Sequence, residues 1–125
     1  MAIRILSVGK IKETYLNDGI GEYTKRLGRY CKLKFIQVPD EKTPDKASEA
    51  LNTQIREIEG ERLQKHIREQ DYVIALAING KMLDSVQLSE KIAALGVQGT
   101  SSITFVIGGS LGLSDQILRR ADYSL

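Results

Sequence analysis

Apolar and polar residues follow two periods along this chain, which divide it into short extended segments and longer helical ones. Residues 3–8 alternate with a period of two and stop at Gly9, as expected of a strand. A second strand is predicted over residues 33–38, before a polar loop. Two further runs, 72–78 and 103–107, are apolar throughout, which is typical of parallel strands covered on both faces.

Between these strands the apolar residues recur at spacings of three and four, the period of an amphipathic helix. The predicted helices span residues 13–30, 46–69 and 85–95, and a fourth begins near Ser114. Gly60 lies inside the second of them and predicts a kink or an early end there. Gly96 and Gly99 predict the end of the third.

The alternation of strands and helices predicts an α/β fold, with a mostly parallel sheet and helices on both of its faces. At 125 residues we expect one domain over 1–125, and residues 121–125 resemble the start of a further strand. No apolar run reaches the roughly 18 residues that cross a membrane. The first residues do not form a signal segment, so we expect a cytoplasmic protein.

The net charge of +2 is distributed unevenly. Residues 1–34 contain eight basic and three acidic side chains, whereas the rest of the chain contains ten basic and thirteen acidic ones. A basic half attracts a polyanion such as a nucleic acid, although a solvated amphipathic face has the same composition. The candidate contacts to phosphates are Lys10, Lys12, Lys25, Arg26 and Arg29.

Residue types that support metal or hydrolytic chemistry are scarce. Cys31 and His66 are the single cysteine and the single histidine, so the sequence predicts neither a disulfide nor a metal site. The chain contains no G-x-x-x-x-G-K-[ST] phosphate loop and no G-x-S-x-G elbow. Its carboxylates lie mostly on polar helices, and none of them is identified as a general base.

The apolar run 103–107 ends in Gly108 and Gly109, shortly before the last predicted helix. Ligands of open α/β sheets bind outside the carboxyl ends of the strands, where glycine lets the backbone approach closely. A plain strand-to-helix turn needs glycine for the same reason, so both interpretations stay open. If the two apolar strands are neighbours, the segment from Leu76 onward opens on the same crevice. Such a site suits a small cofactor that carries its own reactive group.

Six segments together resemble a known family. They are Val8–Tyr15, Glu22–Leu27, Val38–Lys42, Glu59–Arg62, Ala75–Lys81 and Phe105–Leu113. Their combination is similar to the ribosomal RNA large-subunit methyltransferase H family, which belongs to the SPOUT class with its α/β trefoil knot. The match extends from Gly9 to Asp122.

This resemblance implies methyl transfer from S-adenosyl-L-methionine to ring nitrogen 3 of a pseudouridine in 23S rRNA, on the assembled ribosome. It also implies a homodimer, with the cofactor held in a deep knot at the C-terminal part of the sheet. Leu76 and Gly108 match the family's cofactor contacts by motif, and Gly109 is added by adjacency. The five basic candidates become contacts to rRNA phosphates, which position an RNA but do not specify it.

Members of this family continue beyond the position where this sequence ends, with a further cofactor loop, a helix threaded through the knot and a basic tail. We therefore expect these 125 residues to form the scaffold of a methyltransferase that is itself inactive or nearly so. Two other classes stay open. One is a non-catalytic module that binds the ribosome or RNA, and the other is an unrelated nucleotide-binding enzyme of doubly wound fold.

Overall fold

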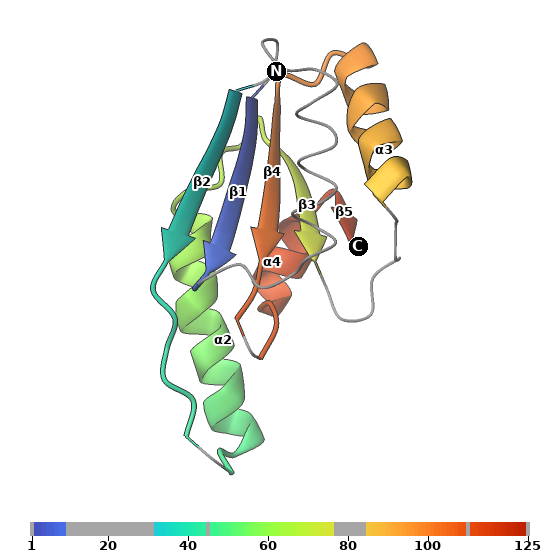
Figure 1. The fold of residues 1–125 in the computed structure, drawn as a ribbon. Coiled ribbons are helices and arrows are strands. Elements are labelled where there is room, and N and C mark those ends of the chain that lie inside the picture. The colour runs from blue at the N-terminus through green and yellow to red at the C-terminus, as the bar shows by residue number, and fades with distance from the viewer. Residues whose placement is uncertain (1, 10–31, 45, 77–84, 110, 125) are drawn as a thin grey trace.

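A computed structural model describes residues 2–9, 32–44, 46–76, 85–109 and 111–124. These residues form a five-stranded sheet in which each neighbouring pair of strands is parallel, with the order β2-β1-β4-β3-β5 (Figure 1). The strands are β1 (Ala2–Val8), β2 (Lys32–Val38), β3 (Tyr72–Leu76), β4 (Ser102–Ile107) and β5 (Tyr123–Ser124). The helices are α2 (Glu49–Gln64), α3 (Ser85–Val97) and α4 (Asp115–Arg120).

The expected parallel α/β fold is confirmed. Four strands form at the predicted places, and the last residues form the short β5 beside β3. Asp122 anchors that edge, because its main-chain N–H donates to the carbonyl of Val73 (2.8 Å) and its carboxylate accepts from the N–H of Val73 (2.8 Å). The predicted helix 13–30 and all five basic candidates lie outside the described residues.

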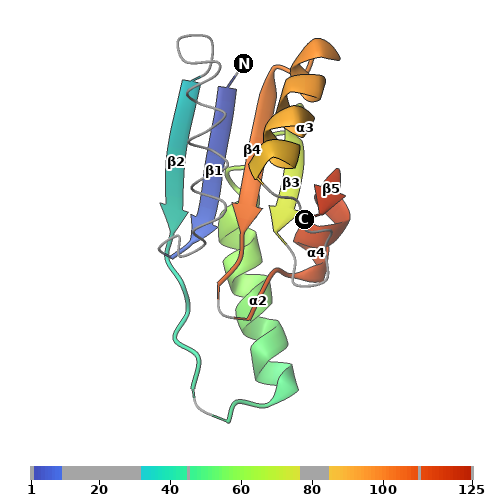
Figure 2. The ribbon, with the colours of Figure 1, turned by 45° about the vertical axis from the view of Figure 1, so that its right-hand side comes forward.

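Helices cover both faces of the sheet. Figures 1 and 2 show α2 and α4 behind the strands and α3 on the opposite face. Alternate strand residues on one face of the sheet pack with residues of α2 and the α4 region in a single buried cluster. The strand residues are Leu6, Val8, Val38, Val73, Ala75 and Val106, and the others are Leu63, Leu113 and Ile117. The described helices contain none that is long and apolar enough to span a membrane.

The second predicted helix is shorter than the apolar period indicated. Ser48 caps it, since the Ser48 hydroxyl accepts the N–H of Leu51 (3.1 Å). Its last residue is Gln64, and the chain then turns with the N–H of His66 bonded to the carbonyl of Leu63 (3.0 Å). The predicted range 46–69 is therefore wrong at both ends, because local hydrogen bonds and not the apolar period set the limits.

Gly60 neither kinks nor ends α2, so that prediction is also wrong. The helix continues to Gln64, and Gly60 is buried where α2 meets the start of α4. A β-carbon at this position would overlap the hydroxyl oxygen of Ser114. The glycine therefore permits close approach of two helices.

The third helix ends as a glycine-terminated helix is expected to end, though two residues later than predicted. Gly96 is still helical and Val97 is the last helical residue. Gly99 adopts φ +91°, its N–H donates to the carbonyl of Gly96 (3.1 Å), and the N–H of Thr100 donates to that of Leu95 (3.0 Å). This pair of bonds is a Schellman motif, which places Gly99 at the left-handed position.

Candidate functional site

The ends of β3 and β4 lie side by side at the carboxyl edge of the sheet. Leu76, the last residue of β3, is paired with Ile107, the last residue of β4. Gly108 follows Ile107 in the chain and therefore lies next to the end of β3. The condition of that expectation, that the two apolar strands are neighbours, is confirmed, and parallel neighbours end at the same edge of the sheet. The residues that follow Leu76, 77–84, lie outside the described residues, so the shared crevice stays a prediction.

The described residues after β4 form a tight turn, referred to below as the glycine turn (residues 108, 109, 111 and 112). The N–H of Gly112 donates to the carbonyl of Gly109 (3.0 Å), and Gly112 itself adopts φ +84°. A β-carbon on Gly108 would lie 2.6 Å from both the carbonyl carbon and oxygen of Gly112. The main chain at Gly108 packs directly on the main chain at Gly112, which cannot move aside as a side chain can. This position therefore requires a residue without a β-carbon.

Gly109 is packed against two residues from other elements. A β-carbon there would lie 3.2 Å from Oε1 of Glu59 on α2 and 3.2 Å from Cγ1 of Val8 on β1. Glu59 is only 4% exposed. The glycine turn thus rests directly on a buried carboxylate.

Two residues of α2 also hold the loop that follows β2. The N–H of Glu41 donates to Oε2 of Glu59 (3.0 Å). One turn further, Arg62 donates to the carbonyl of Pro39 (2.9 Å) and forms an ion pair with Glu41. The segments 38–42 and 59–62, which both belong to the family resemblance, are therefore in direct contact.

The electrostatic environment of Glu59 opposes its negative charge. Burial raises the pKa of the Glu59 carboxyl, and the nearby carboxylates of Asp40 and Glu41 raise it further. The hydrogen bond from the N–H of Glu41 and the charge of Arg62 lower that pKa in part, but the net direction is upward.

Sequence reasoning missed Glu59. In a helix of mostly polar residues, a single glutamate is indistinguishable from its solvated neighbours, and the buried stripe is visible only when the partners of α2 are known. The available signal was Gly60 beside it, since a glycine inside a helix marks close packing. Within the part of the chain that the structure describes, no group of three or more potential ligands is placed to hold a metal ion.

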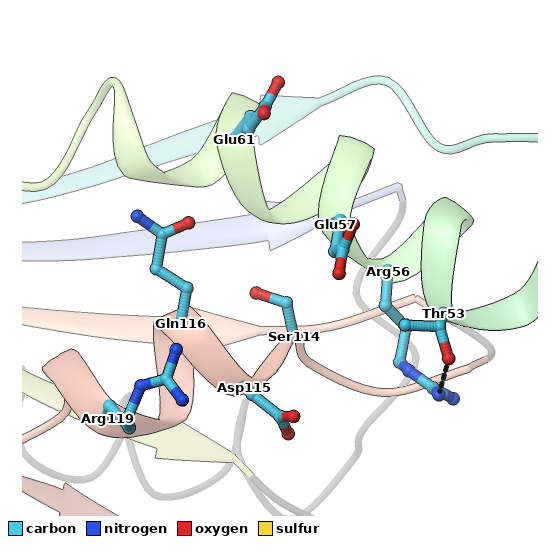
Figure 3. A pocket seen from close by; sticks show the side chains of 8 residues that line it. All are labelled: Thr53, Arg56, Glu57, Glu61, Ser114, Asp115, Gln116 and Arg119. Carbon is cyan, nitrogen blue, oxygen red and sulfur yellow. Dashed lines mark hydrogen bonds between the residues drawn. The ribbon is translucent and has the colours of Figure 1, made fainter. Parts of the chain in front are cut away.

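A polar groove of about 450 Å³ lies between α2 and α4 (Figure 3). Its lining residues are Thr53, Arg56, Glu57 and Glu61 from α2, and Ser114, Asp115, Gln116 and Arg119 from the α4 region. Within it, Arg56 donates to the hydroxyl of Thr53 (3.1 Å). Leu76, Gly108 and Gly109 do not line this groove, so it is separate from the glycine turn.

Comparison with known proteins gives matches over the whole chain. A family model described as "Predicted SPOUT methyltransferase" matches residues 1–125. A protein of Bifidobacterium adolescentis named ribosomal RNA large subunit methyltransferase H is 60% identical over 125 residues, which are 100% of this chain and 79% of that protein.

Proteins of the same name from two other organisms give similar values. The one from Leuconostoc mesenteroides is 54% identical over 100% of this chain and 79% of its own length. The one from Streptococcus suis is 55% identical over 98% of this chain and 77% of its own length. The chain therefore spans about four fifths of each of these relatives.

Proposed function

This chain belongs to the SPOUT methyltransferase family and matches its ribosomal RNA large subunit methyltransferase H members. From that premise we propose that it transfers a methyl group from S-adenosyl-L-methionine to ring nitrogen 3 of a pseudouridine in 23S rRNA. The observation that carries the proposal is the pairing of Leu76 with Ile107, which brings the end of β3 beside the glycine turn.

The described residues at this edge fit such a cofactor. Strands β1 and β4 are neighbours, but the chain continues from them in opposite directions along the sheet, from β1 to β2 and from β4 to β5. Open α/β sheets bind ligands near such a switch point. Leu76, Gly108 and Gly109 would hold the cofactor there, largely through main-chain groups.

The charges of the described residues near the turn favour a cofactor without phosphates. Around Glu59, the carboxylates of Asp40 and Glu41 accompany one guanidinium, that of Arg62. An excess of carboxylates repels a phosphorylated nucleotide, whereas S-adenosylmethionine carries a positive sulfonium. This difference argues against the alternative of an unrelated nucleotide-binding enzyme. When bound, S-adenosylmethionine supplies an activated methyl group, so the protein's main task is alignment, which contributes up to roughly 7–11 kcal/mol in such reactions.

The RNA partner is proposed to be contacted by Lys10, Lys12, Lys25, Arg26 and Arg29, whose charges suit rRNA phosphates. The proposal further includes the assembled ribosome as substrate, a knotted C-terminal region, a cytoplasmic location and a homodimer. The base that removes the proton from the target nitrogen is not assigned to a residue.

Calorimetric titration with S-adenosylmethionine tests the proposal on two proteins. One is this 125-residue chain, and the other is a chimera extended by the C-terminal residues of the Bifidobacterium adolescentis relative. Binding to both would locate most of the site at the glycine turn and β3. Binding to the chimera alone would support the cofactor and show that the turn needs those residues.

Transfer of a labelled methyl group to ribosomes, followed by mapping of the modified nucleotide, tests the reaction itself. Incorporation at one pseudouridine of 23S rRNA is the expected result. Ribosome binding by a chimera that binds no cofactor would overturn the proposal in favour of a non-catalytic module.

A further inference from the structure

The described residues include two buried acidic side chains, Glu59 and Asp71, and their surroundings differ. Asp71 is paired with two guanidinium groups, those of Arg4 (3.2 Å) and Arg68 (3.0 Å). Among the ion pairs of the described residues, Glu59 takes part in none, and the nearby Arg62 is paired with Glu41 instead. A buried charge that no described cation pairs with directly is costly for a fold, so the position of Glu59 calls for an explanation beyond the packing of the described residues.

The position of Glu59 supplies one. Its two carboxylate oxygens lie 3.2 and 3.3 Å from where a β-carbon of Gly109 would be, so no side chain separates the charge from the turn. On its other side Glu59 is covered by the loop after β2, through the N–H of Glu41. The charge is therefore shielded from bulk water and lies directly against Gly109, one of the residues proposed to hold the cofactor.

We propose that Glu59 is a selectivity residue whose buried carboxylate favours S-adenosylmethionine over S-adenosylhomocysteine. This inference rests on the proposed function. The two compounds share the adenosine, the amino group and the carboxylate, and they differ at sulfur by one methyl group and one positive charge. A negative charge in a medium of low dielectric attracts the sulfonium and has no such attraction for the thioether. The same carboxylate therefore retains the methyl donor and releases the product.

The substitution Glu59→Gln tests this inference, because glutamine keeps the shape and an acceptor for the N–H of Glu41 while removing the charge. Glu61→Gln is the matched control, since it removes the same charge from an exposed position on the same helix. Dissociation constants for both compounds are measured by calorimetry on the wild-type chain and both variants, in the chimera if only the chimera binds.

The expected result is that E59Q lowers the preference for S-adenosylmethionine by about tenfold, with little change for S-adenosylhomocysteine. The preference of E61Q stays that of the wild type. Equal weakening of both compounds in E59Q, or no change in either, would overturn the inference and leave the proposed function intact. Failure of both compounds to bind the wild-type chain and the chimera would overturn the proposed function, and the inference with it.

A second measurement applies if circular dichroism shows that E59Q does not fold. The preference of the wild type is then followed from about pH 8 to about pH 5, toward the raised pKa of Glu59. Among the described residues, the charged groups that face Glu59 are Asp40, Glu41 and Arg62, whereas Val8 and Gly109 do not titrate. We expect the preference to fall as the pH falls, and a constant preference would overturn the inference.

Discussion

Gly60 of α2 lies directly against Ser114, the residue that caps α4. Helices α2 and α4 cover the same face of the sheet, and the glycine turn connects β4 to the Ser114 cap (Figures 1 and 2). Close packing at position 60 therefore places the start of α4, and through it the C-terminal end of the turn.

Gly60→Ala should destabilise the protein. Alanine improves helix propensity by about 1 kcal/mol, but its β-carbon would overlap the Ser114 hydroxyl, and overpacking costs about 1–3 kcal/mol. We expect a net loss of up to about 2 kcal/mol in the free energy of unfolding, measured by urea denaturation. The matched control is a double-mutant cycle with Ser114→Ala, in which the loss should be smaller because the overlapping oxygen is gone. Additive effects would contradict this account.

Gly108→Ala and Gly109→Ala should differ in severity. The added β-carbon of G108A would meet main-chain atoms of Gly112 at 2.6 Å, whereas that of G109A would meet side chains at 3.2 Å, which can shift. We expect G108A to destabilise the chain by about 3 kcal/mol and to abolish cofactor binding, and G109A to destabilise it by about 1 kcal/mol. Thermal denaturation and calorimetry measure both effects, and equal effects would contradict the described packing.

Asp71 should stabilise the fold at neutral pH. Its burial raises the pKa, but hydrogen bonds from the N–H and guanidinium of Arg68 and with Ser102 outweigh burial, so the pKa of Asp71 is lowered from 3.8. A lowered pKa contributes stability that is present above the unfolded-state value and is lost as the pH falls through the folded-state value. Asp71→Asn should therefore lower the unfolding free energy by about 2–4 kcal/mol at neutral pH. Urea titrations at a series of pH values should show this difference shrinking as the pH falls below the unfolded-state pKa of Asp71. A difference that stays constant with pH would contradict the assignment.

The contribution of Glu59 to stability should change with pH in the opposite direction to that of Asp71. Its pKa is raised above 4.5 by burial, so its contribution to stability is fully present below the unfolded-state value and is lost as the pH rises through the folded-state value. The wild type should therefore lose stability relative to Glu59→Gln as the pH rises above the unfolded-state value of Glu59 and through its raised folded-state value. The same urea titrations measure this difference in unfolding free energy. A gain of stability by the wild type relative to Glu59→Gln over the same pH interval would refute the account of Glu59 as a buried, poorly compensated charge.

Charge reversal of Lys10 and Lys12 should weaken binding to the ribosome. Each lost phosphate contact reduces the dependence of log K on log salt by about 0.7–0.9. Filter binding across a salt series measures both the affinity and the slope. The control is Lys46→Glu with Lys65→Glu, which reverses two exposed charges outside the basic segment. An unchanged slope in the Lys10 and Lys12 variant would remove these residues from the interface.

The strands were predictable because their signals are local. Residues 103–107 form a buried strand whatever their neighbours are, since the apolar run is continuous. The sequence did not predict the pairing of Leu76 with Ile107 but only what would follow if the two apolar strands were neighbours. Strand order is set by contacts between distant segments, which a local pattern does not contain. Glu59 and Gly60 could not be interpreted from their own helix, because their functions depend on Gly109 and Ser114, which come much later in the chain.

The interior position of β1, between β2 and β4, has a consequence for biosynthesis. This strand is synthesised before the other described strands, yet one of its two flanking strands, β4, is formed by Ser102–Ile107. Until those residues are synthesised, one side of β1 has an open row of hydrogen-bonding groups, and long-range parallel pairing of this kind is slow and prone to aggregation. The nascent chain therefore cannot complete its sheet until the residues of β4 and β5 have been synthesised.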